Sequence, residues 1–430
     1  MLLLHLSDIH FREPDCNAAD LDPNRPIRTR IMHDARRRVE ELGPVDAILV
    51  GGDIAFKGHP DEYAAAAAWL HELADQVGCS RNRIYVVPGN HDVDRTIARE
   101  SLRTRNAHDA IRRAPLNERD RHLRAQFADP FTSEALLLPL AAYNAFAALF
   151  NCQVYGPDKL YWKQDLALSN DVTLRIHGLT STMLSGVNGQ DDHQHDLYLS
   201  PLQTVLDPID DTVNLVLCHH PPDWFADNDA VNDAINARAK LHLFGHKHRQ
   251  RLTRDPAYAR FGAGAVNPDR GELEWQPSYN LIKLSVADHG ANRTLEIEAH
   301  LLHWQTEPEG YVPTMYNEEP AAHHAVAIPS HRRPTDSVNA RTLPTQEPKV
   351  ATQTKPDVEA AMSDEPTRDL IYRFWQLTIG QRRDITQALG LIEDHDLGTP
   401  EPERYGRAFL RAKERHLLEA LAAAVREAET

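Results

Sequence analysis

The residues of this chain that could do chemistry gather in short polar motifs, each directly after an apolar run. One such motif is Asn90-His91-Asp92, which follows the apolar run 84–87 and the pair Pro88-Gly89. The run predicts a buried strand, and the Pro-Gly pair predicts that the strand ends in a tight loop. An amide oxygen there could bind a divalent cation, a histidine could donate a proton, and an aspartate could orient that histidine. A polar turn between a strand and a helix would look the same if the motif stood alone.

The same construction occurs four more times. Apolar runs at 2–6, 47–50, 213–217 and 241–244 each lead into histidine or aspartate. Ligands often gather at the carboxyl ends of adjacent strands, so the sequence predicts that these side chains meet at one place. The residues concerned are Asp8, His10, Asp53, His219, His220, His246 and His248.

Taken in order, these motifs resemble the calcineurin-like metallophosphoesterase superfamily, whose pattern is D-x-H, GD, GNHD, H-x-P and GHxH. The resemblance covers residues 1–304 and implies a centre of two metal ions. In that arrangement Asp53 bridges the ions, Asp8, His10 and His248 complete one site, and Asn90, His219 and His246 complete the other. The H-x-P spacing to Pro221 favours His219 over His220 as the ligand.

Hydrolysis of a phosphoester needs a nucleophile at neutral pH and neutralisation of the charge on the phosphoryl oxygens. Two divalent metal ions supply both. A donor set of imidazole and oxygen without cysteine suits manganese, iron or zinc better than calcium, and we expect manganese. His91 then lies outside the ligand set, where it can protonate the leaving oxygen or stabilise the transition state, and we expect Asp92 to orient it.

The substrate is less well defined than the metal centre. The D-x-H and H-x-P motifs with the short GHxH resemble cyclic-nucleotide phosphodiesterases and repair nucleases, which implies a phosphodiesterase acting on a nucleotide or nucleic acid. One alternative is a phosphomonoesterase or protein phosphatase. Another is a signalling adaptor whose catalytic module acts only on recruitment.

Composition limits the classes of partner. The 430 residues carry a formal net charge of −16, which argues against broad electrostatic attachment to nucleic acid or to an anionic membrane. The four cysteines lie far apart without a C-x-x-C pair, as expected in a reducing cytoplasm. Residues 2–4 lack a basic start and lead straight into the first motif, so we expect a core strand there, with no signal peptide and no membrane span.

The elements that must position the motifs alternate along the chain. Helices are expected over 27–42 and 61–77 between the first three strands, and further strands over 172–178, 279–286 and 294–302, the last two at a sheet edge. This order indicates an α/β fold. The family resemblance implies two mixed β-sheets packed face to face and flanked by helices.

A helical insertion is expected over about 95–150. Its first part, 95–124, carries nine arginines, which could clamp a phosphate-bearing substrate or could simply be a solvated face paired with nearby acids. Its second part, 133–150, is apolar enough to pack as a helix. The loop 186–200 is expected to cross the site, with Asp191, Asp192, His193 and His195 exposed.

A Pro-rich linker is expected over 305–365, followed by a small all-α domain over 366–430. Helices are predicted over 369–377, 380–391 and 401–428, and the last is either buried on two sides or broken near Arg415-His416. The unit resembles the effector-associated, death-like adaptor domains of prokaryotic conflict systems, which implies a protein partner and a role in antiviral defence; the alternative is a generic helical tail. The residues that carry this resemblance are Phe374, Arg382-Arg383, Leu389-Gly390-Leu391, Glu403-Arg404, Arg411-Ala412 and Leu417-Leu418.

Overall fold

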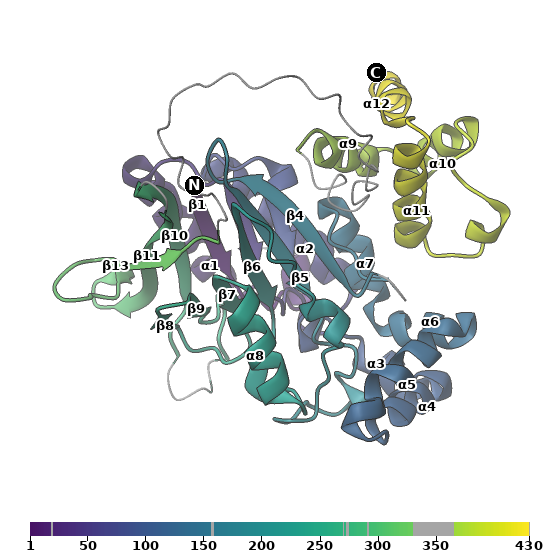
Figure 1. Ribbon diagram of the computed structural model, residues 1–430, viewed down its shortest axis with the longest axis horizontal. Helices are drawn as coiled ribbons and strands as arrows, with labels where there is room; N and C mark the ends of the chain where they lie inside the picture. Colours follow the sequence, from purple (N-terminus) through teal and green to yellow (C-terminus); the bar gives the residue numbers. More distant parts are fainter. Residues whose placement is uncertain are drawn as a thin grey trace, which may run out of the picture.

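Two mixed β-sheets packed face to face form the centre of the protein, as Figure 1 shows. The structure is a computed structural model that describes residues 1–18, 20–155, 159–269, 271, 275–289, 292–329 and 365–429. Apolar side chains of both sheets, among them Leu4 and Leu215, belong to one buried cluster. The expected α/β sandwich with flanking helices is therefore confirmed.

The first sheet has the order β12-β11-β10-β1-β2-β3, with β13 also paired to β11. Strands β1, β2 and β3 are parallel, whereas β10 runs antiparallel to β1. The expectation of edge strands over 279–286 and 294–302 is wrong. Strand β10 pairs with β11 and, over residues 280–283, with β1, and strand β11 pairs with β10 on one side and with β12 and β13 on the other. The strands are β1 (Leu2–Leu6), β2 (Ala47–Val50), β3 (Ile84–Val86), β10 (Ser278–His289), β11 (Asn292–Thr306), β12 (Glu309–Pro313) and β13 (Ala322–Ala327).

The second sheet has the order β4-β5-β6-β7-β9-β8. Strands β5, β6, β7 and β9 are parallel, and β4 and β8 run antiparallel to their neighbours at the two edges. The strands are β4 (Tyr161–Ala167), β5 (Thr173–Leu179), β6 (Thr212–Cys218), β7 (Leu241–Phe244), β8 (Arg251–Asp255) and β9 (Tyr258–Gly262).

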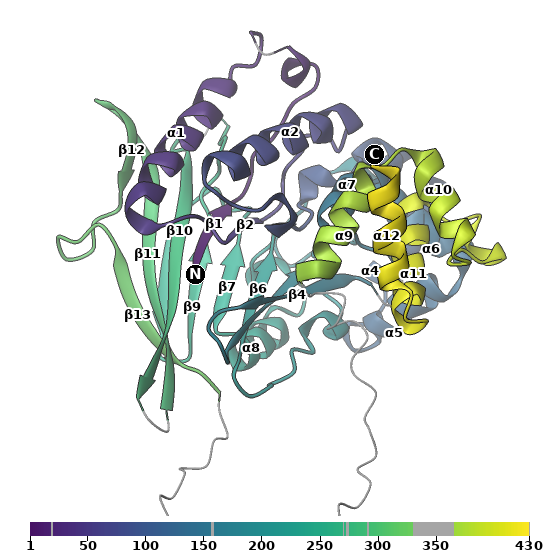
Figure 2. The ribbon, with the colours of Figure 1, turned by 90° about the horizontal axis from the view of Figure 1, so that it is seen from above.

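Helices cover the outer faces of the sandwich. Helices α1 (Arg25–Leu42) and α2 (Pro60–Gln76) connect the first three strands and lie together on the first sheet (Figure 2). Helix α1 ends at Gly43, whose φ of 92° is a conformation that glycine adopts without strain. On the second sheet, α8 (Asn228–Arg238) packs Val231 and Ile235 into a cluster with Phe244.

The insertion is helical, but its apolar second part is divided. Pro139 lies in a single 3-10 turn that separates α6 from α7, where a continuous helix was expected. By length and composition alone the segment Pro130–Phe150 could cross a membrane, but half of it is buried inside the structure. Tyr143 from this segment donates a hydrogen bond to the carbonyl of Val86 in β3, so the segment packs as part of the core. The helices are α3 (Arg95–Glu100), α4 (Leu102–Arg112), α5 (Leu116–Ala128), α6 (Pro130–Leu137) and α7 (Ala141–Ala147).

The region expected as a linker begins as part of the first sheet. Strands β12 and β13 both lie after residue 305, and Tyr311 of β12 is buried against Trp304 of β11. The expected start of the linker at 305 is therefore wrong, because prolines here fall at strand ends and turns and leave the paired segments intact. Residues 330–364 of the expected linker lie outside the described residues.

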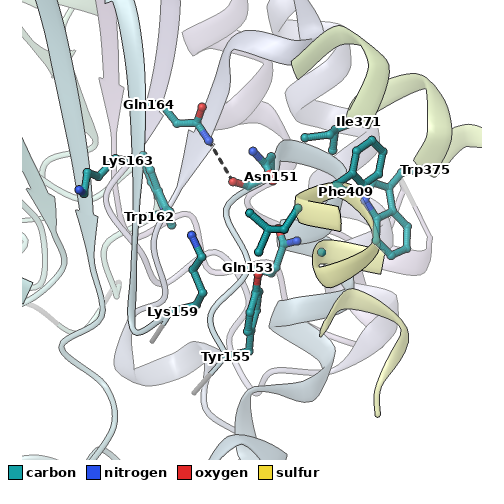
Figure 3. Close-up of a pocket in the computed structure, with 12 residues that line it drawn as sticks. Asn151, Gln153, Tyr155, Lys159, Trp162, Lys163, Gln164, Ile371, Trp375 and Phe409 are labelled. Carbon is teal, nitrogen blue, oxygen red and sulfur yellow. Dashed lines mark hydrogen bonds between the residues drawn. The ribbon is translucent and has the colours of Figure 1, made fainter. Parts of the chain in front are cut away.

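The C-terminal unit consists of α9 (Glu365–Gln376), α10 (Ile379–Ala388), α11 (Glu401–Glu414) and α12 (Leu418–Ala428). The two views place it beside α7 (Figures 1 and 2). Figure 3 shows the junction, where Trp375 and Phe409 of this unit and Tyr155 and Trp162 line a cavity of about 50 Å³. The last predicted helix is broken at Arg415-His416, one of the two alternatives that the sequence left open.

Candidate metal centre

The seven candidate ligands converge where the parallel strands end. Asp8 and His10 follow β1, Asp53 follows β2, Asn90 follows β3, and the remaining three histidines follow β6 and β7. Because parallel strands present their carboxyl ends at one edge of a sheet, the two sheets bring these loops to a common place. The structure thus assembles His219, His246 and His248 with the residues of the first sheet, and their role as ligands stays a prediction.

Two groups of donor atoms share Asp53. In the first group, His248 Nε2 lies 3.1 Å from Asp8 Oδ1, and His10 Nε2 lies 3.4 Å from Asp53 Oδ2. In the second group, Asn90 Oδ1 lies 3.1 Å from His219 Nε2 and 3.0 Å from His246 Nδ1. His219 Nε2 is also 3.4 Å from the same Oδ2 of Asp53. Asp53 therefore stands between the two groups, as the bridging role requires.

The donor set fits divalent cations. The Nδ1 of His219 donates to the carbonyl of Gly51 at 2.8 Å, which leaves the lone pair of Nε2 directed at Asn90 and Asp53. A second hydrogen bond that fixes the tautomer in this way is typical of a metal-binding histidine. Asp8 and Asp53 are buried, and a buried carboxylate needs a compensating cation.

The electrostatics of the site attract positive charge. Although burial opposes the shift, Asp53 and Asp8 raise the pKa of His219 to about 9. Burial also opposes ionisation of Asp53, yet His219 and His91 hold the pKa of that carboxyl well below its usual range. Without a metal ion, a proton on His219 balances the negative charge of Asp53 and Asp8. The residues present are therefore suited to the divalent ions that the fold family implies.

The backbone at the site is held in an uncommon conformation. Asp8, His10, Asp53, His246 and His248 have φ values of 55°, 51°, 51°, 69° and 50°. This left-handed region is uncommon for residues other than glycine and costs free energy, so such residues often cluster at functional sites. The strained backbone turns each side chain back toward the cluster immediately after its strand.

Gly89 shows how tightly the loops pack. A Cβ atom on this residue would lie 2.1 Å from Oδ1 of Asp53 and 2.4 Å from the amide nitrogen of Asp53. No side chain can occupy that space unless the loop that holds Asp53 moves. Glycine is therefore required before Asn90 for a steric reason.

His91 lies beside the cluster, but Asp92 does not hold its ring. The carboxylate of Asp92 accepts hydrogen bonds from the backbone amides of Gly89, Ile54 and Ala55, and from the hydroxyl of Tyr63 at 3.0 Å. The ring of His91 instead places Nδ1 3.0 Å from the carbonyl of Phe56. The expectation that Asp92 orients His91 is therefore wrong. Asp92 joins the loops after β2 and β3, because its buried oxygens satisfy the amides of both.

Two further residues lie beside the candidate ligands: His220, which the H-x-P spacing ranked below His219 as a ligand, and Asp192, which was not recognised from the sequence. His220 places Nδ1 2.8 Å from the hydroxyl of Ser181, and its ring lies 4.4 Å from that of His246. Asp192, expected to be exposed, has a side chain only 6% exposed, and one of its oxygens lies 4.0 Å from Nε2 of His220. The only sequence signal for Asp192 is its polar loop, and nothing local marks that residue as the buried one.

Six of the nine arginines of the insertion pair with acids. Arg113, the residue that follows α4, contacts Asp109 of α4 at 2.7 Å, and Arg121 contacts Glu118 at 2.7 Å within α5. Arg112 of α4 lies 3.4 Å from Asp196, in the loop that the insertion covers. These contacts favour the solvated, acid-paired face over a dedicated phosphate clamp.

Two packed sheets with a histidine, aspartate and asparagine cluster at their strand ends define an α/β metallohydrolase. Residues 1–250 match the family model of the calcineurin-like phosphoesterases, which is more than half of the chain, so the chain belongs to that family. The family implies a phosphoester substrate and divalent metal ions. Residues 366–427 match the GTPase-associated adaptor domain, which confirms an adaptor unit after the catalytic domain.

Curated relatives match a part of the chain. The glycerophosphodiester phosphodiesterase GpdQ of Enterobacter lignolyticus is 34% identical over 111 residues, 24% of this chain and 33% of that protein. The metallophosphoesterase-like protein YydB of Bacillus subtilis is 30% identical over 102 residues, 23% of this chain and 19% of that protein. The chain thus spans a third or less of the length of these relatives. The solved structure of Vps29 from Chaetomium thermophilum matches with 12% identity and a TM-score of 0.29, over 76% of this chain and 100% of Vps29.

Proposed function

We propose that the chain is a phosphodiesterase that uses two divalent metal ions to hydrolyse a nucleotide or nucleic-acid phosphodiester. The observation that carries this proposal is the convergence of the two donor groups on Asp53. Asp8, His10, Asp53 and His248 would hold one ion, and Asn90, His219 and His246, with Asp53 shared, the other. Ions bound there would supply an activated water and neutralise the phosphoryl oxygens. We propose manganese, because the donors are nitrogen and oxygen without sulfur, with iron and zinc as the alternatives.

His91 is the residue we propose as the proton donor to the leaving oxygen. The carbonyl of Phe56 can only accept a hydrogen bond, so Nδ1 of His91 carries the hydrogen in that contact, and Nε2 is left to exchange a proton. Phe56 also stacks on the ring, with 4.9 Å between the centroids and 19° between the planes. These contacts hold the ring in one orientation, which is what general acid catalysis requires.

A diester is favoured over a monoester by the motif set and by the activity that the name of the relative GpdQ prints. The test is hydrolysis of bis-para-nitrophenyl phosphate against para-nitrophenyl phosphate, with manganese, iron or zinc added to metal-free protein. We expect a higher kcat/KM for the diester, with manganese most effective. A higher value for the monoester would assign the chain to the phosphomonoesterases or protein phosphatases instead.

We propose that the C-terminal unit recruits a protein partner associated with a GTPase, and that the enzyme serves as a cytoplasmic effector in prokaryotic defence. The match to the GTPase-associated adaptor domain supports this, as does the exposure of Ile379 (63%) and Leu397 (56%) on the unit. The substitution Ile379→Asp should abolish co-purification of a GTPase from the native host while hydrolysis is retained. Hydrolysis and recruitment lost together would contradict separable roles.

A further inference from the structure

A cavity of about 690 Å³ opens beside the candidate metal centre. Gly245 and Lys247, the two neighbours of His246 in the chain, line it, as does Pro221, two residues after His219. Ligand sites in proteins commonly occupy volumes of about 300–1,000 Å³. The cavity is therefore large enough for the part of a substrate that extends beyond the phosphate being cleaved.

The lining of this cavity is locally basic, although the chain as a whole is acidic. The cations are Lys247, Arg249, Arg251 and Arg260, and the acids are Asp223 and Asp229. Lys247 pairs with Asp223, and Arg260 donates to the amide oxygens of Asn232 and Asn236, at 2.9 and 2.7 Å. A basic wall in a chain of net charge −16 would attract an anionic group at this place.

Arg251 is placed by the alternation of its strand. Side chains along a strand point to opposite faces in turn, and Arg251 and Thr253 of β8 both line the cavity. Arg254 of the same strand belongs to the other face, where its Nη1 lies 3.4 Å from the carbonyl of His323. The strand thus supplies one arginine that faces the cavity and one that does not.

Trp224 adds an aromatic wall next to the metal centre. Its ring lies 3.9 Å from that of His246, with an interplanar angle of 82°, and the indole lines the cavity. An aromatic ring next to arginines is suited to a nucleobase, which can stack on the ring.

We propose that this cavity binds a nucleotide unit joined to the phosphate being cleaved, with its base against Trp224 and a further phosphate near Arg251. This inference rests on the proposed phosphodiesterase function and names the substrate class as a dinucleotide or a single-stranded oligonucleotide. It also places the determinant of substrate specificity on the β8 side of the metal centre and not on the arginines of the insertion, six of which pair with acids.

The test measures binding to metal-free protein, so that hydrolysis does not enter. A fluorescein-labelled hexanucleotide is titrated by anisotropy with the wild-type chain, Arg251→Gln and the matched control Arg254→Gln. We expect Arg251→Gln to weaken binding about tenfold, the effect of losing one charge-assisted hydrogen bond, and to lower the salt slope by about one. Arg254→Gln should bind as the wild type does. Equal affinities for the two variants, or no binding of the hexanucleotide by the wild type at low salt, would overturn the inference.

Competition by an unlabelled 5′-phosphorylated dinucleotide distinguishes the two possible substrates, a dinucleotide and a longer single strand. Full displacement of the hexanucleotide, with the same dependence on Arg251, supports a site for one nucleotide unit. A dependence on Arg251 seen only with the hexanucleotide supports a longer strand. Hydrolysis of bis-para-nitrophenyl phosphate by the wild type is measured in parallel: its absence with every metal would refute the proposed function, whereas the binding comparison still decides the inference.

Discussion

Asp53 is the residue on which the two donor groups depend. The substitution Asp53→Asn keeps Oδ1, which accepts the amide of His91 at 2.8 Å, but replaces the charged Oδ2 that faces His10 and His219. One neutral amide cannot hold two dications together, so we expect both metal binding and turnover to be abolished. Metal content by mass spectrometry and hydrolysis of the activated diester check this.

The matched control for Asp53 is Asp165→Asn, because Asp165 pairs with Arg175 within the β4–β5 hairpin and away from the cluster. This control should keep its metal and its activity. Wild-type metal content in Asp53→Asn would show that the bridging assignment is wrong.

His91 is expected to separate proton transfer from metal binding. The substitution His91→Ala should leave both ions bound and lower the rate on a substrate with a poor leaving group by roughly 10²–10⁴, the usual contribution of a positioned acid. The deficit should shrink with a nitrophenolate leaving group, which needs no proton. Rates are compared across leaving groups at fixed metal content, and loss of metal would place His91 among the ligands instead.

The residues of the site could be predicted from sequence where a motif places them directly after a strand. Asp8, Asp53 and His219 are of this kind, because the strand determines where its end lies. The partners of Asp92 could not be predicted, because Ile54 and Ala55 lie on another loop and offer backbone amides that no residue type marks. Asp192 was missed because it is buried beside His220, a residue that lies far from it in the sequence.

At the scale of elements, the break between α11 and α12 has a defined geometry. The amide of Leu417 donates to the carbonyl of Ala412, and the amide of His416 donates to that of Lys413 at 3.0 Å. This is the Schellman arrangement that ends many helices, and its left-handed position, usually glycine, is here His416 with φ of 56°. The sequence left the break open because the residue that commonly signals it is missing.

The substitution His416→Gly should stabilise the C-terminal unit. Glycine adopts the left-handed conformation without steric cost, although it also loses more freedom on folding, so we expect a net gain of about 0.5–1 kcal/mol. Chemical denaturation followed by the fluorescence of Trp375, within this unit, would measure the gain. The control is Gly390→Ala, where φ is 62° and the same reasoning predicts a loss. Destabilisation by His416→Gly would mean that the histidine side chain itself supports the turn.

At the scale of the whole molecule, one buried side chain joins the C-terminal unit to the catalytic domain. Arg368 of α9 is 3% exposed, donates to the carbonyls of Asn82 and Phe150, and lies 4.2 Å from the ring centre of Tyr85. Tyr85 belongs to β3, the strand that leads into Asn90 and His91, and Asn82 lies in the 3-10 turn Arg81–Arg83 directly before that strand. The adaptor unit therefore packs against the base of a strand that carries the site. The sequence could place both units but not this contact, which spans more than 280 residues.

The substitution Arg368→Ala should loosen this junction. It removes the charge-assisted hydrogen bonds to the buried carbonyl of Asn82, a cost of about 1–3 kcal/mol, whereas the carbonyl of Phe150 still accepts from the thiol of Cys152. Native-state hydrogen exchange should then show faster exchange in α9, while amides of α11 and α12 keep their protection. The matched control is Arg373→Ala on the same helix, where an ion pair with Glu429, about a third exposed, should contribute less than about 1 kcal/mol. Equal exchange in the two variants would show that Arg368 does not anchor the unit, and that the apolar contacts of α9 around Ile371 and Phe374 hold it in place without help.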